Sequence, residues 1–339
     1  MRCLIEGGIQ ARALDRARLA TVAFMLAVAV CATDPFTTRC AALTNRDDGS
    51  GITMGRPIIG YVAHSSPLEL RAILGIPGAA VFSDPLLLPR HVTRIRLAPS
   101  QQYALIERER QEPVVLLLTA ANAGRAVSLA GAFPVADLAA FSPFGRSAVL
   151  FSVSAKRLQV IAGLPDAPQI VRDLDVGVLP EPPEAMAISD DAGSVLLSSA
   201  GAVYWLLPGG STRMVVNVAD VPALVFFPNS ANAAIGDRTA GSVYLFRNLA
   251  GGITTSLLAT GLDGLEEITS SGSYETLYIT KPRGQCIWSI RVATGEVRAF
   301  KLGVNPVRMQ QFRPLCLLVL ERTKAGCRLA PPVAVDRSQ

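Results

Sequence analysis

Two histidines and a few carboxylates are the residues of this chain whose chemistry could support catalysis. His64 and His91 are the only imidazoles among the 339 residues, and no Gly-x-Ser-x-Gly turn presents a serine to either of them. Two histidines are also too few for a metal or quinone site built from several imidazoles. We therefore expect no catalytic residue and place both histidines in loops or in the core.

Two acidic motifs invite a functional interpretation and have a simpler structural one. The motif from Asp190 to Gly193 reads Asp-Asp-Ala-Gly but lacks the further oxygen ligands that a calcium loop carries at alternating positions. It predicts a hairpin turn in which an aspartate bonds its own backbone and the glycine takes positive φ. Glu266 and Glu267 predict one exposed and one partly buried strand residue, because an acid–base pair needs a defined separation.

The composition indicates a large folded core and argues against nucleic-acid binding. Apolar residues make up 50% of the chain and charged residues 17%, which is too apolar for a disordered protein. The net charge of +5 is mild. A nucleic-acid partner would call for a clustered basic stripe with stacking aromatic side chains, so none is expected.

The N-terminal segment has the pattern of an export signal. Arg12, Arg16 and Arg18 precede 14 apolar residues from Leu19 to Ala32, too few for a comfortable membrane span. Residues 1–32 therefore predict a signal peptide or, as the alternative, an uncleaved anchor, which would be the only contact with a membrane. The protein is expected to be periplasmic, secreted or associated with the envelope. Residues 33–56 are polar and aperiodic and predict a linker.

The cysteines outside the N-terminal segment give no metal motif. Cys40, Cys286, Cys316 and Cys327 show no C-x-x-C spacing, which argues against a zinc or thioredoxin-like site. Export would permit disulfides. Cys316 and Cys327 lie on neighbouring predicted strands and are the first pair to test, with buried free thiols as the open alternative.

A repeated strand pattern must position all of these residues. Apolar runs of four to eight residues, rich in Val, Ile, Tyr and Trp and bounded by Gly and Pro, indicate strands. The clearest example is Leu277–Pro306, which contains three such runs. In six copies an apolar strand enters a turn at equivalent positions 38 to 47 residues apart. These turn positions are Pro99, Pro143, Asp190, Pro228, Ser271 and Arg313.

A period of this length predicts an all-β fold, a β-propeller of four-stranded blades. We expect six blades over residues 57–334, with a tail at 335–339. Residues 57–76 supply strands that complete the C-terminal blade and cover its edges. Seven blades are the alternative if Cys327–Val335 belongs to a separate sheet. A closed ring buries its own edges, so we expect a monomer.

Several copies resemble the YVTN and NHL classes of β-propeller repeat. Leu277–Thr280 stands at the family's Tyr-Val-Thr-Asn strand, and Ile287–Ile290 at the strand that follows. Ala293–Val297 resembles the Ala-Thr-Gly-Lys-Val turn, and Gly303–Pro306 the Gly-x-x-Pro that starts the next blade. The chain departs from the signature at Lys281, where the family often has Asn. The resemblance covers about residues 57–334 and implies the fold of exported bacterial propellers, but no particular ligand.

Loop charges carry the functional prediction. In a propeller, the loops between the second and third strands emerge on the same face as the connections between blades, and that face commonly binds ligands. The first set of loops forms a predicted basic rim, which would attract a protein or an anionic glycan or lipid headgroup. The rim residues are Arg108, Arg110, Lys156, Arg238, Lys281 and Arg283.

The blade connections supply acids nearer to the axis and leave a second interpretation open. The main hypothesis is a non-catalytic, extracytoplasmic interaction module without a cofactor. The alternative is a metal-dependent propeller enzyme of the lactonase or sugar-dehydrogenase type, with calcium in the channel. The ligands in that alternative would be Glu184, Asp220, Asp263 and Glu266.

Overall fold

The computed structural model describes residues 57–329 except 77–78, 120–122, 208, 250, 272–274, 282–284, 302–305, 313–315 and 324–325, and describes side chains between residues 57 and 301. The predicted signal or anchor (1–32), the linker (33–56) and the tail (335–339) lie outside the described residues. The described residues all belong to one compact unit. No helix in this part of the chain is long and apolar enough to cross a membrane.

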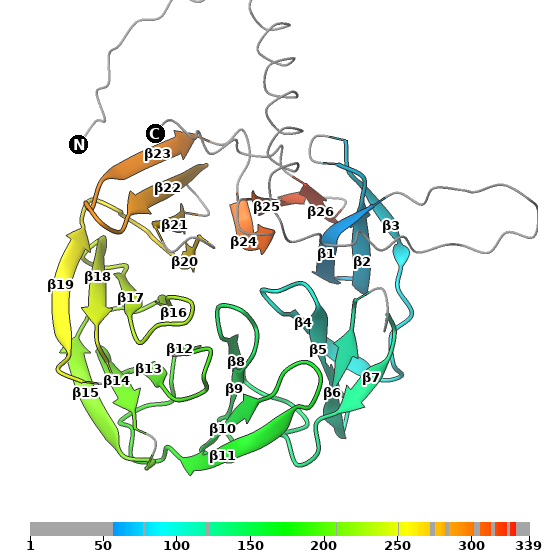
Figure 1. Cartoon of the computed structure of the whole chain (residues 1–339), viewed down its shortest axis with the longest axis horizontal. Helices are drawn as coiled ribbons and strands as arrows, with labels where there is room; N and C mark the ends of the chain where they lie inside the picture. Colours follow the sequence, from blue (N-terminus) through cyan, green and yellow to red (C-terminus); the bar gives the residue numbers. More distant parts are fainter. Residues whose placement is uncertain are drawn as a thin grey trace, which may run out of the picture. The chain divides into compact units, whose positions relative to one another are not determined.

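The described chain is all-β and folds into antiparallel sheets arranged in a ring (Figure 1). Sheet 1 contains β1 (Ile58–Ser65), β2 (Leu68–Leu74) and β3 (Val81–Pro85). Sheet 2 contains β4 (Val92–Leu97), β5 (Tyr103–Arg108), β6 (Gln111–Leu117) and β7 (Ala126–Ser128). Sheet 3 contains β8 (Leu138–Phe141), β9 (Ala148–Ser152), β10 (Arg157–Ala162) and β11 (Gln169–Asp175).

The second half of the ring repeats this up-and-down order. Sheet 4 contains β12 (Ala185–Ile188), β13 (Val195–Ser199), β14 (Ala202–Leu206) and β15 (Thr212–Asn217). Sheet 5 contains β16 (Ala223–Phe226), β17 (Ala233–Asp237), β18 (Ser242–Arg247) and β19 (Thr254–Ala259). Sheet 6 contains β20 (Glu267–Ser270), β21 (Thr276–Lys281), β22 (Cys286–Arg291) and β23 (Val297–Lys301). Sheet 7 contains β24 (Pro306–Phe312), β25 (Cys316–Thr323) and β26 (Gly326–Leu329).

The predicted fold class, an all-β propeller of four-stranded blades, is confirmed. Sheets 2 to 6 are complete four-stranded blades, and the inner strands β8, β12, β16 and β20 each contact the next in this order. The two sheets at the ends of the chain have three strands each, and β26 pairs with β25, so Cys327 does not lie in the separate sheet that the seven-blade alternative requires. The prediction that the strands of residues 57–76 complete the C-terminal blade is wrong. β1 pairs with β2, and β2 pairs with the unforeseen β3; this sheet lies beside β4 and is separate from the C-terminal sheet of β24, β25 and β26.

The core lies between adjacent sheets, which explains why the strands are apolar on both faces. In β5, Tyr103 and Leu105 point to the cluster shared with sheet 3, whereas Ala104 and Ile106 point to the cluster shared with sheet 1. Successive side chains of a strand point to opposite faces, so a sheet covered on both sides needs an unbroken apolar run. Each such run in the sequence is therefore a strand in the middle of a blade.

The outer strands are exposed on one side and carry bulges. In β11, β15 and β19 the register with the preceding strand shifts by one residue. Bulges of this kind increase the local twist and interrupt an edge that could pair with another chain. Val171, Met214 and Leu257 on these strands are about half exposed. The repeated bulge is consistent with a ring whose outer edges are not extended by further strands.

The turns between the first and second strands share one backbone conformation. In three of them the last turn residue takes positive φ, at Gln101 (61°), Gly145 (69°) and Ala192 (57°). The predicted turn at Asp190–Gly193 is therefore confirmed, with a correction: Ala192 takes the left-handed conformation, and the Gly193 N–H donates a hydrogen bond to Asp191. An alanine tolerates this conformation because the turn hydrogen bond and the surrounding core hold it there.

The predicted cysteine pair is incompatible with the strand register. Cys316 and Cys327 lie on the neighbouring strands β25 and β26, as expected, but Cys327 is opposite Arg322 and not opposite Cys316. Six residues of strand separate Cys316 from Arg322, which is about 20 Å at roughly 3.3 Å per residue. A disulfide requires Cα atoms closer than about 7 Å. The two cysteines are therefore not bonded to each other in this arrangement.

Candidate binding face

Loops from two positions in each blade meet on one face of the ring, which we call the loop face. The loop between the second and third strands of a blade forms backbone hydrogen bonds with the segment that connects this blade to the preceding or the following one. Val176 N–H donates to the carbonyl of Lys156, Arg238 N–H to that of Asp220, and Leu262 N–H to that of Gly241. The prediction that these loops share a face is confirmed by these contacts. Main-chain bonds also make the face a rigid support for the side chains on it.

Sheets 2 and 3 carry three of the predicted rim cations on exposed parts of this face. Arg108 donates two hydrogen bonds to the backbone carbonyl of Glu112, at 3.0 and 2.6 Å, which leaves its charge without a paired carboxylate. Arg110 and Lys156 occupy left-handed turn positions with φ of 54° and 51°, and both are exposed. Neither forms an ion pair with another described residue.

Arg238 differs from these cations because a carboxylate already binds it. Its guanidinium donates to both oxygens of Asp220, at 2.7 and 3.0 Å. The pKa of Arg238 is raised, first by this hydrogen bonding to Asp220 and further by the nearby charges of Glu266 and Glu184, while desolvation opposes the shift. Arg238 therefore belongs to an acidic part of the loop face and is not a free rim cation.

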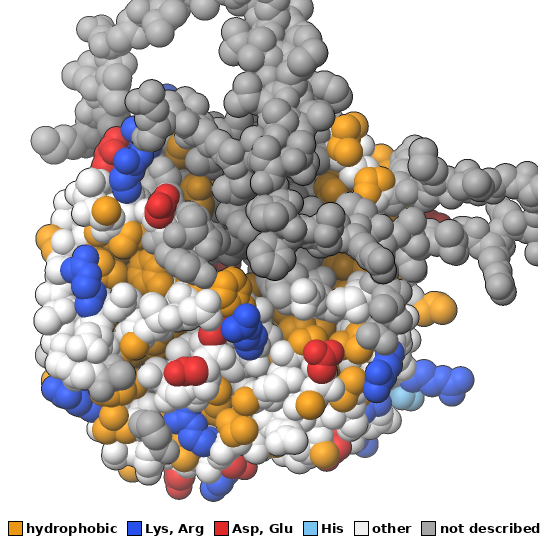
Figure 2. All heavy atoms as spheres, in the orientation of Figure 1, with side chains coloured by type: hydrophobic (Ala, Val, Ile, Leu, Met, Phe, Trp, Pro, Cys, Tyr) orange, Lys and Arg blue, Asp and Glu red, His pale blue; other side chains and the backbone are white. Residues whose placement is uncertain are grey.

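The other two rim residues lie in sheet 6. The Nζ of Lys281 lies 5.9 Å from the centre of the Trp288 ring, within cation–π range. The Lys281 side chain also passes over Gly264 in the preceding connection: a methyl group added at that glycine would lie 3.4 Å from Lys281 Cε. Arg283 lies outside the described residues. The face in view in Figure 2 shows cations and carboxylates scattered among apolar and uncharged groups, with no large patch of either sign.

The four acids of the alternative metal site do not form a ligand set. Asp220 is already bound by Arg238, and Asp263 and Glu266 are exposed on the connection before β20. Within the described residues, no group of three or more His, Cys, Asp or Glu side chains is placed to hold a metal ion. Glu184 lies on the connection before β12, where its charge reaches Arg238.

The histidines and the paired glutamates occupy structural positions. His64 lies in β1, and its ring meets Phe82 edge to face at 5.8 Å between centroids. Burial lowers the pKa of His64, Arg71 lowers it further, and Glu69 acts in the opposite direction. His91 immediately precedes β4. Glu266 is exposed and Glu267, in β20, is partly buried, as predicted for the pair.

A charged cluster between sheets 2 and 3 was not recognised from the sequence. Its acid is Glu107, which lies in β5 with only 2% of its side chain exposed. Arg96 Nε donates to Glu107 Oε1 at 2.8 Å, and Arg94 Nη1 lies 3.6 Å from Glu107 Oε2. Both arginines also donate to the carbonyl of Ala136, at 2.7 Å from Arg94 and 3.0 Å from Arg96.

Two sequence features could have revealed this cluster. Arg94 and Arg96 are two residues apart in a strand and therefore share a face of it. Glu107 follows four apolar residues of a central strand, where a buried acid requires a cationic partner. The pairing itself depends on the β4–β5 register, which places Arg94 opposite Glu107.

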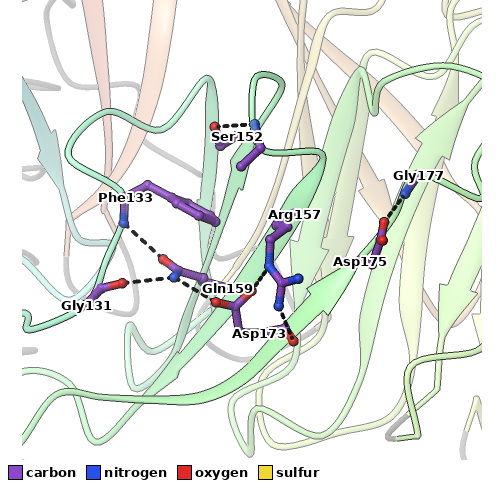
Figure 3. Close-up of polar contacts among 9 residues, drawn as sticks. Gly131, Phe133, Ser152, Arg157, Gln159, Asp173, Asp175 and Gly177 are labelled. Carbon is purple, nitrogen blue, oxygen red and sulfur yellow. Dashed lines mark hydrogen bonds and ion pairs between the residues drawn. The ribbon is translucent and has the colours of Figure 1, made fainter.

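A second network holds the connection between sheets 2 and 3 that carries Ala136 (Figure 3). The buried amide of Gln159 accepts a hydrogen bond from Phe133 N–H at 3.0 Å and donates to the Gly131 carbonyl at 3.0 Å. It also donates to Asp173, whose other oxygen accepts from Arg157 at 2.7 Å. Residues 131–133 of the connection are thereby fixed to Gln159 of β10, which is itself bonded to Asp173 of β11.

Comparisons with known proteins support the fold alone. No protein-family model and no curated protein matches the chain. A solved structure of Kuenenia stuttgartiensis hydrazine synthase matches with a TM-score of 0.57 and 10% identity, over 86% of this chain and all of that one. The β-propeller domain of Myceliophthora thermophila Cps50 (Swd1) matches with a TM-score of 0.52 and 10% identity, covering 85% and 99%. A nidogen/laminin complex matches with a TM-score of 0.47 and 14% identity, covering 71% and 92%. The fold, together with the two likenesses whose TM-scores exceed 0.5, places the chain among the β-propeller proteins.

Proposed function

We propose that this protein is a non-catalytic binding propeller that takes a protein partner on the loop face of sheets 2 and 3. The observation that supports this most directly is a set of three cations, Arg108, Arg110 and Lys156, that form no ion pair with a described carboxylate. Arg110 and Lys156 are exposed and Arg108 is partly exposed, and main-chain hydrogen bonds hold the loops that carry them. Rigid loops on a propeller lose little entropy when they bind. Cations grouped in this way attract an acidic surface and accelerate its approach.

The mixture of charges in this region favours a protein over a glycan or a lipid headgroup. Glu109 and Glu112 lie in the same loop as Arg108 and Arg110. A uniformly anionic polymer or membrane would be repelled by these acids, whereas a protein surface can complement both signs. The surface therefore suits an acidic protein patch that carries a few cations of its own.

The proposal includes an extracytoplasmic location and a YVTN- or NHL-like repeat. The basic residues before Leu19 and the apolar run to Ala32 support export. The motifs at Leu277–Thr280 and Ala293–Val297 support the repeat type, and their strands occur in sheet 6. A propeller with all blades in one chain can act as a monomer, and we propose that it does.

Affinity capture from envelope extract with two matched triple variants tests the function. The first variant, Arg108→Glu, Arg110→Glu and Lys156→Glu, reverses the cations of the loop face. The second, with the same change in net charge, reverses three cations on the opposite face. They are Arg125→Glu, Arg213→Glu and Arg247→Glu.

We expect a partner that wild type and the second variant retain and that the first variant binds at least tenfold more weakly. Binding should then be measured between the purified partner and each variant, with melting scans to show that both are folded. Equal retention by both variants would overturn the proposal. Binding only to anionic vesicles or to a sulfated glycan, lost in the first variant, would replace the protein partner by that ligand.

A further inference from the structure

We infer that Arg94 and Arg96 form a binding site for a carboxylate group at the inner strand β4. The site lies where sheets 2 and 3 meet, close to the loop that carries Arg108. The proposed function bears only on the source of the carboxylate, which would be an acidic side chain of the protein partner. Binding of a small carboxylate does not depend on it.

The first argument is an excess of positive charge held in place. Among the ion pairs of described residues, four carboxylates each face one arginine, whereas Glu107 is shared by two. The single pairs are Arg71–Glu69, Arg157–Asp173, Arg238–Asp220 and Arg298–Glu296. The cluster around Glu107 therefore carries one net positive charge that no described carboxylate balances.

The second argument is the supply of free donors. Arg94 uses Nη1 to bind the carbonyl of Ala136, and its Nε and Nη2 groups have no hydrogen-bond acceptor among the described residues. Arg96 uses Nε and Nη2, which leaves Nη1. The side chain of Arg94 is 45% exposed, so its donors can reach a ligand. The planar fork of a guanidinium matches the two oxygens of a carboxylate.

The third argument is preorganisation. Glu107 is buried, and its Oε2 accepts no hydrogen bond from a described residue, so Arg94 is attracted to it at 3.6 Å while its N–H groups stay available. The carbonyl of Ala136 fixes both guanidinium groups from the other side. That carbonyl is held by the Gln159 network on the preceding part of the connection. A receptor already held in its binding geometry loses less entropy when the ligand arrives.

The net charge selects the ligand class. A carboxylate carries a single negative charge, which balances the excess charge of the cluster. A phosphate dianion would add a second negative charge beside the buried carboxylate of Glu107, and like charges at close range oppose binding. We therefore assign the site to a carboxylate.

Side-chain NMR of the arginine Nε–H groups tests this assignment. Sodium acetate is titrated into the protein against sodium chloride at equal ionic strength. The Arg94 signal, identified by its loss in Arg94→Lys, should shift and saturate with acetate and not with chloride. Arg94→Lys and Arg96→Lys keep the charge but remove the fork. Each should weaken acetate binding at least fivefold, followed at the Arg96 signal in Arg94→Lys and at the Arg94 signal in Arg96→Lys. Arg298→Lys, at a half-exposed pair on β23, should not change it.

Equal responses to acetate and chloride, or an unchanged affinity in both lysine variants, would overturn the site. Tighter binding of inorganic phosphate than of acetate would overturn the carboxylate assignment. Melting scans show whether each variant is folded. Lysine keeps the positive charge beside Glu107, so a loss of acetate binding in a folded variant reports the loss of the guanidinium fork. If acetate does not bind but the loop-face triple variant still loses its partner, the inference fails and the proposed function stands. If acetate binds but the triple variant keeps its partner, the inference stands and the proposed function fails.

Discussion

The guanidinium of Arg238 binds both carboxylate oxygens of Asp220, at 2.7 and 3.0 Å, and so joins the β17–β18 loop to the connection between sheets 4 and 5. Both side chains are partly exposed, which limits the strength of the pair. A double-mutant cycle with Arg238→Gln and Asp220→Asn in urea should give a coupling of about 0.2–1 kcal/mol. The more exposed Arg298–Glu296 pair, measured alongside it, should couple more weakly. A larger coupling in that control would contradict the prediction.

Asp190 ties three successive blades together on the face opposite the loops. Its two carboxylate oxygens accept hydrogen bonds from the backbone N–H groups of Phe144 at 2.8 Å and Asn229 at 3.0 Å. Asp190→Ala should lower the free energy of unfolding by about 1.5–3 kcal/mol, since hydrogen bonds to a charged group are lost. Asp190→Asn keeps one acceptor and should lose less. A urea melt of Asp190→Ala within 0.5 kcal/mol of wild type would refute this role.

Gly236 allows sheet 5 to pack closely on sheet 6. A Cβ atom at this position in β17 would lie 2.4 Å from Leu265 Cδ1 and 3.0 Å from Ile268 Cδ1, both in buried side chains. Gly236→Ala should therefore destabilise the fold by about 1–3 kcal/mol through overpacking. Gly252→Ala is the control, because nothing lies within 4 Å of its added methyl group. Equal melting temperatures for the two variants would argue against the close packing.

Asp191 should contribute stability that depends on pH. The hydroxyl of Ser189 donates to its carboxylate and lowers the pKa of Asp191; burial opposes this effect, while the Gly193 N–H and the charge of Arg172 add to it. A folded-state pKa below the unfolded value makes the stabilisation complete above about pH 4, the ordinary aspartate range. It is lost as the pH falls through the lower folded-state pKa.

The stability difference between wild type and Asp191→Asn should therefore be largest near neutral pH and shrink in acid. Urea melts at several pH values between neutral and about pH 3 measure it. Ser189→Ala should reduce the pH-dependent part because it removes the largest cause of the lowered pKa. A difference that stays constant with pH would show that the carboxylate charge does not contribute.

Calcium should not change the melting temperature. The four acids Glu184, Asp220, Asp263 and Glu266 form no ligand group in the described structure, and Asp220 is bound to Arg238. Melting scans in calcium and in chelator, with metal analysis of the purified protein, check this expectation. One bound ion and a shift of several degrees would favour the metal-dependent alternative and require the acids to rearrange.

The strands could be predicted well because their signals are local. The three apolar runs expected within Leu277–Pro306 correspond to the strands β21, β22 and β23. An apolar run between turn residues specifies a strand wherever the blade is buried on both faces. The strand β3 was missed because Val81–Pro85 is short and mostly exposed. The pairing of β2 with β3, in a sheet separate from the C-terminal strands, was also missed, since the edge at which a strand pairs is not a local property.

The binding face likewise combines features that the local sequence determines with pairings that only the fold decides. The chain's own pattern of residues determined the strands, their alternating direction and hence which loops share a face, because antiparallel strands in sequence reverse at every turn. Only the tertiary structure decided which charges on that face are free. Arg238 is neutralised by a residue 18 positions earlier. Arg94 and Arg96 meet the carbonyl of Ala136 some 40 residues away. These pairings depend on how neighbouring sheets pack, which no local sequence pattern specifies.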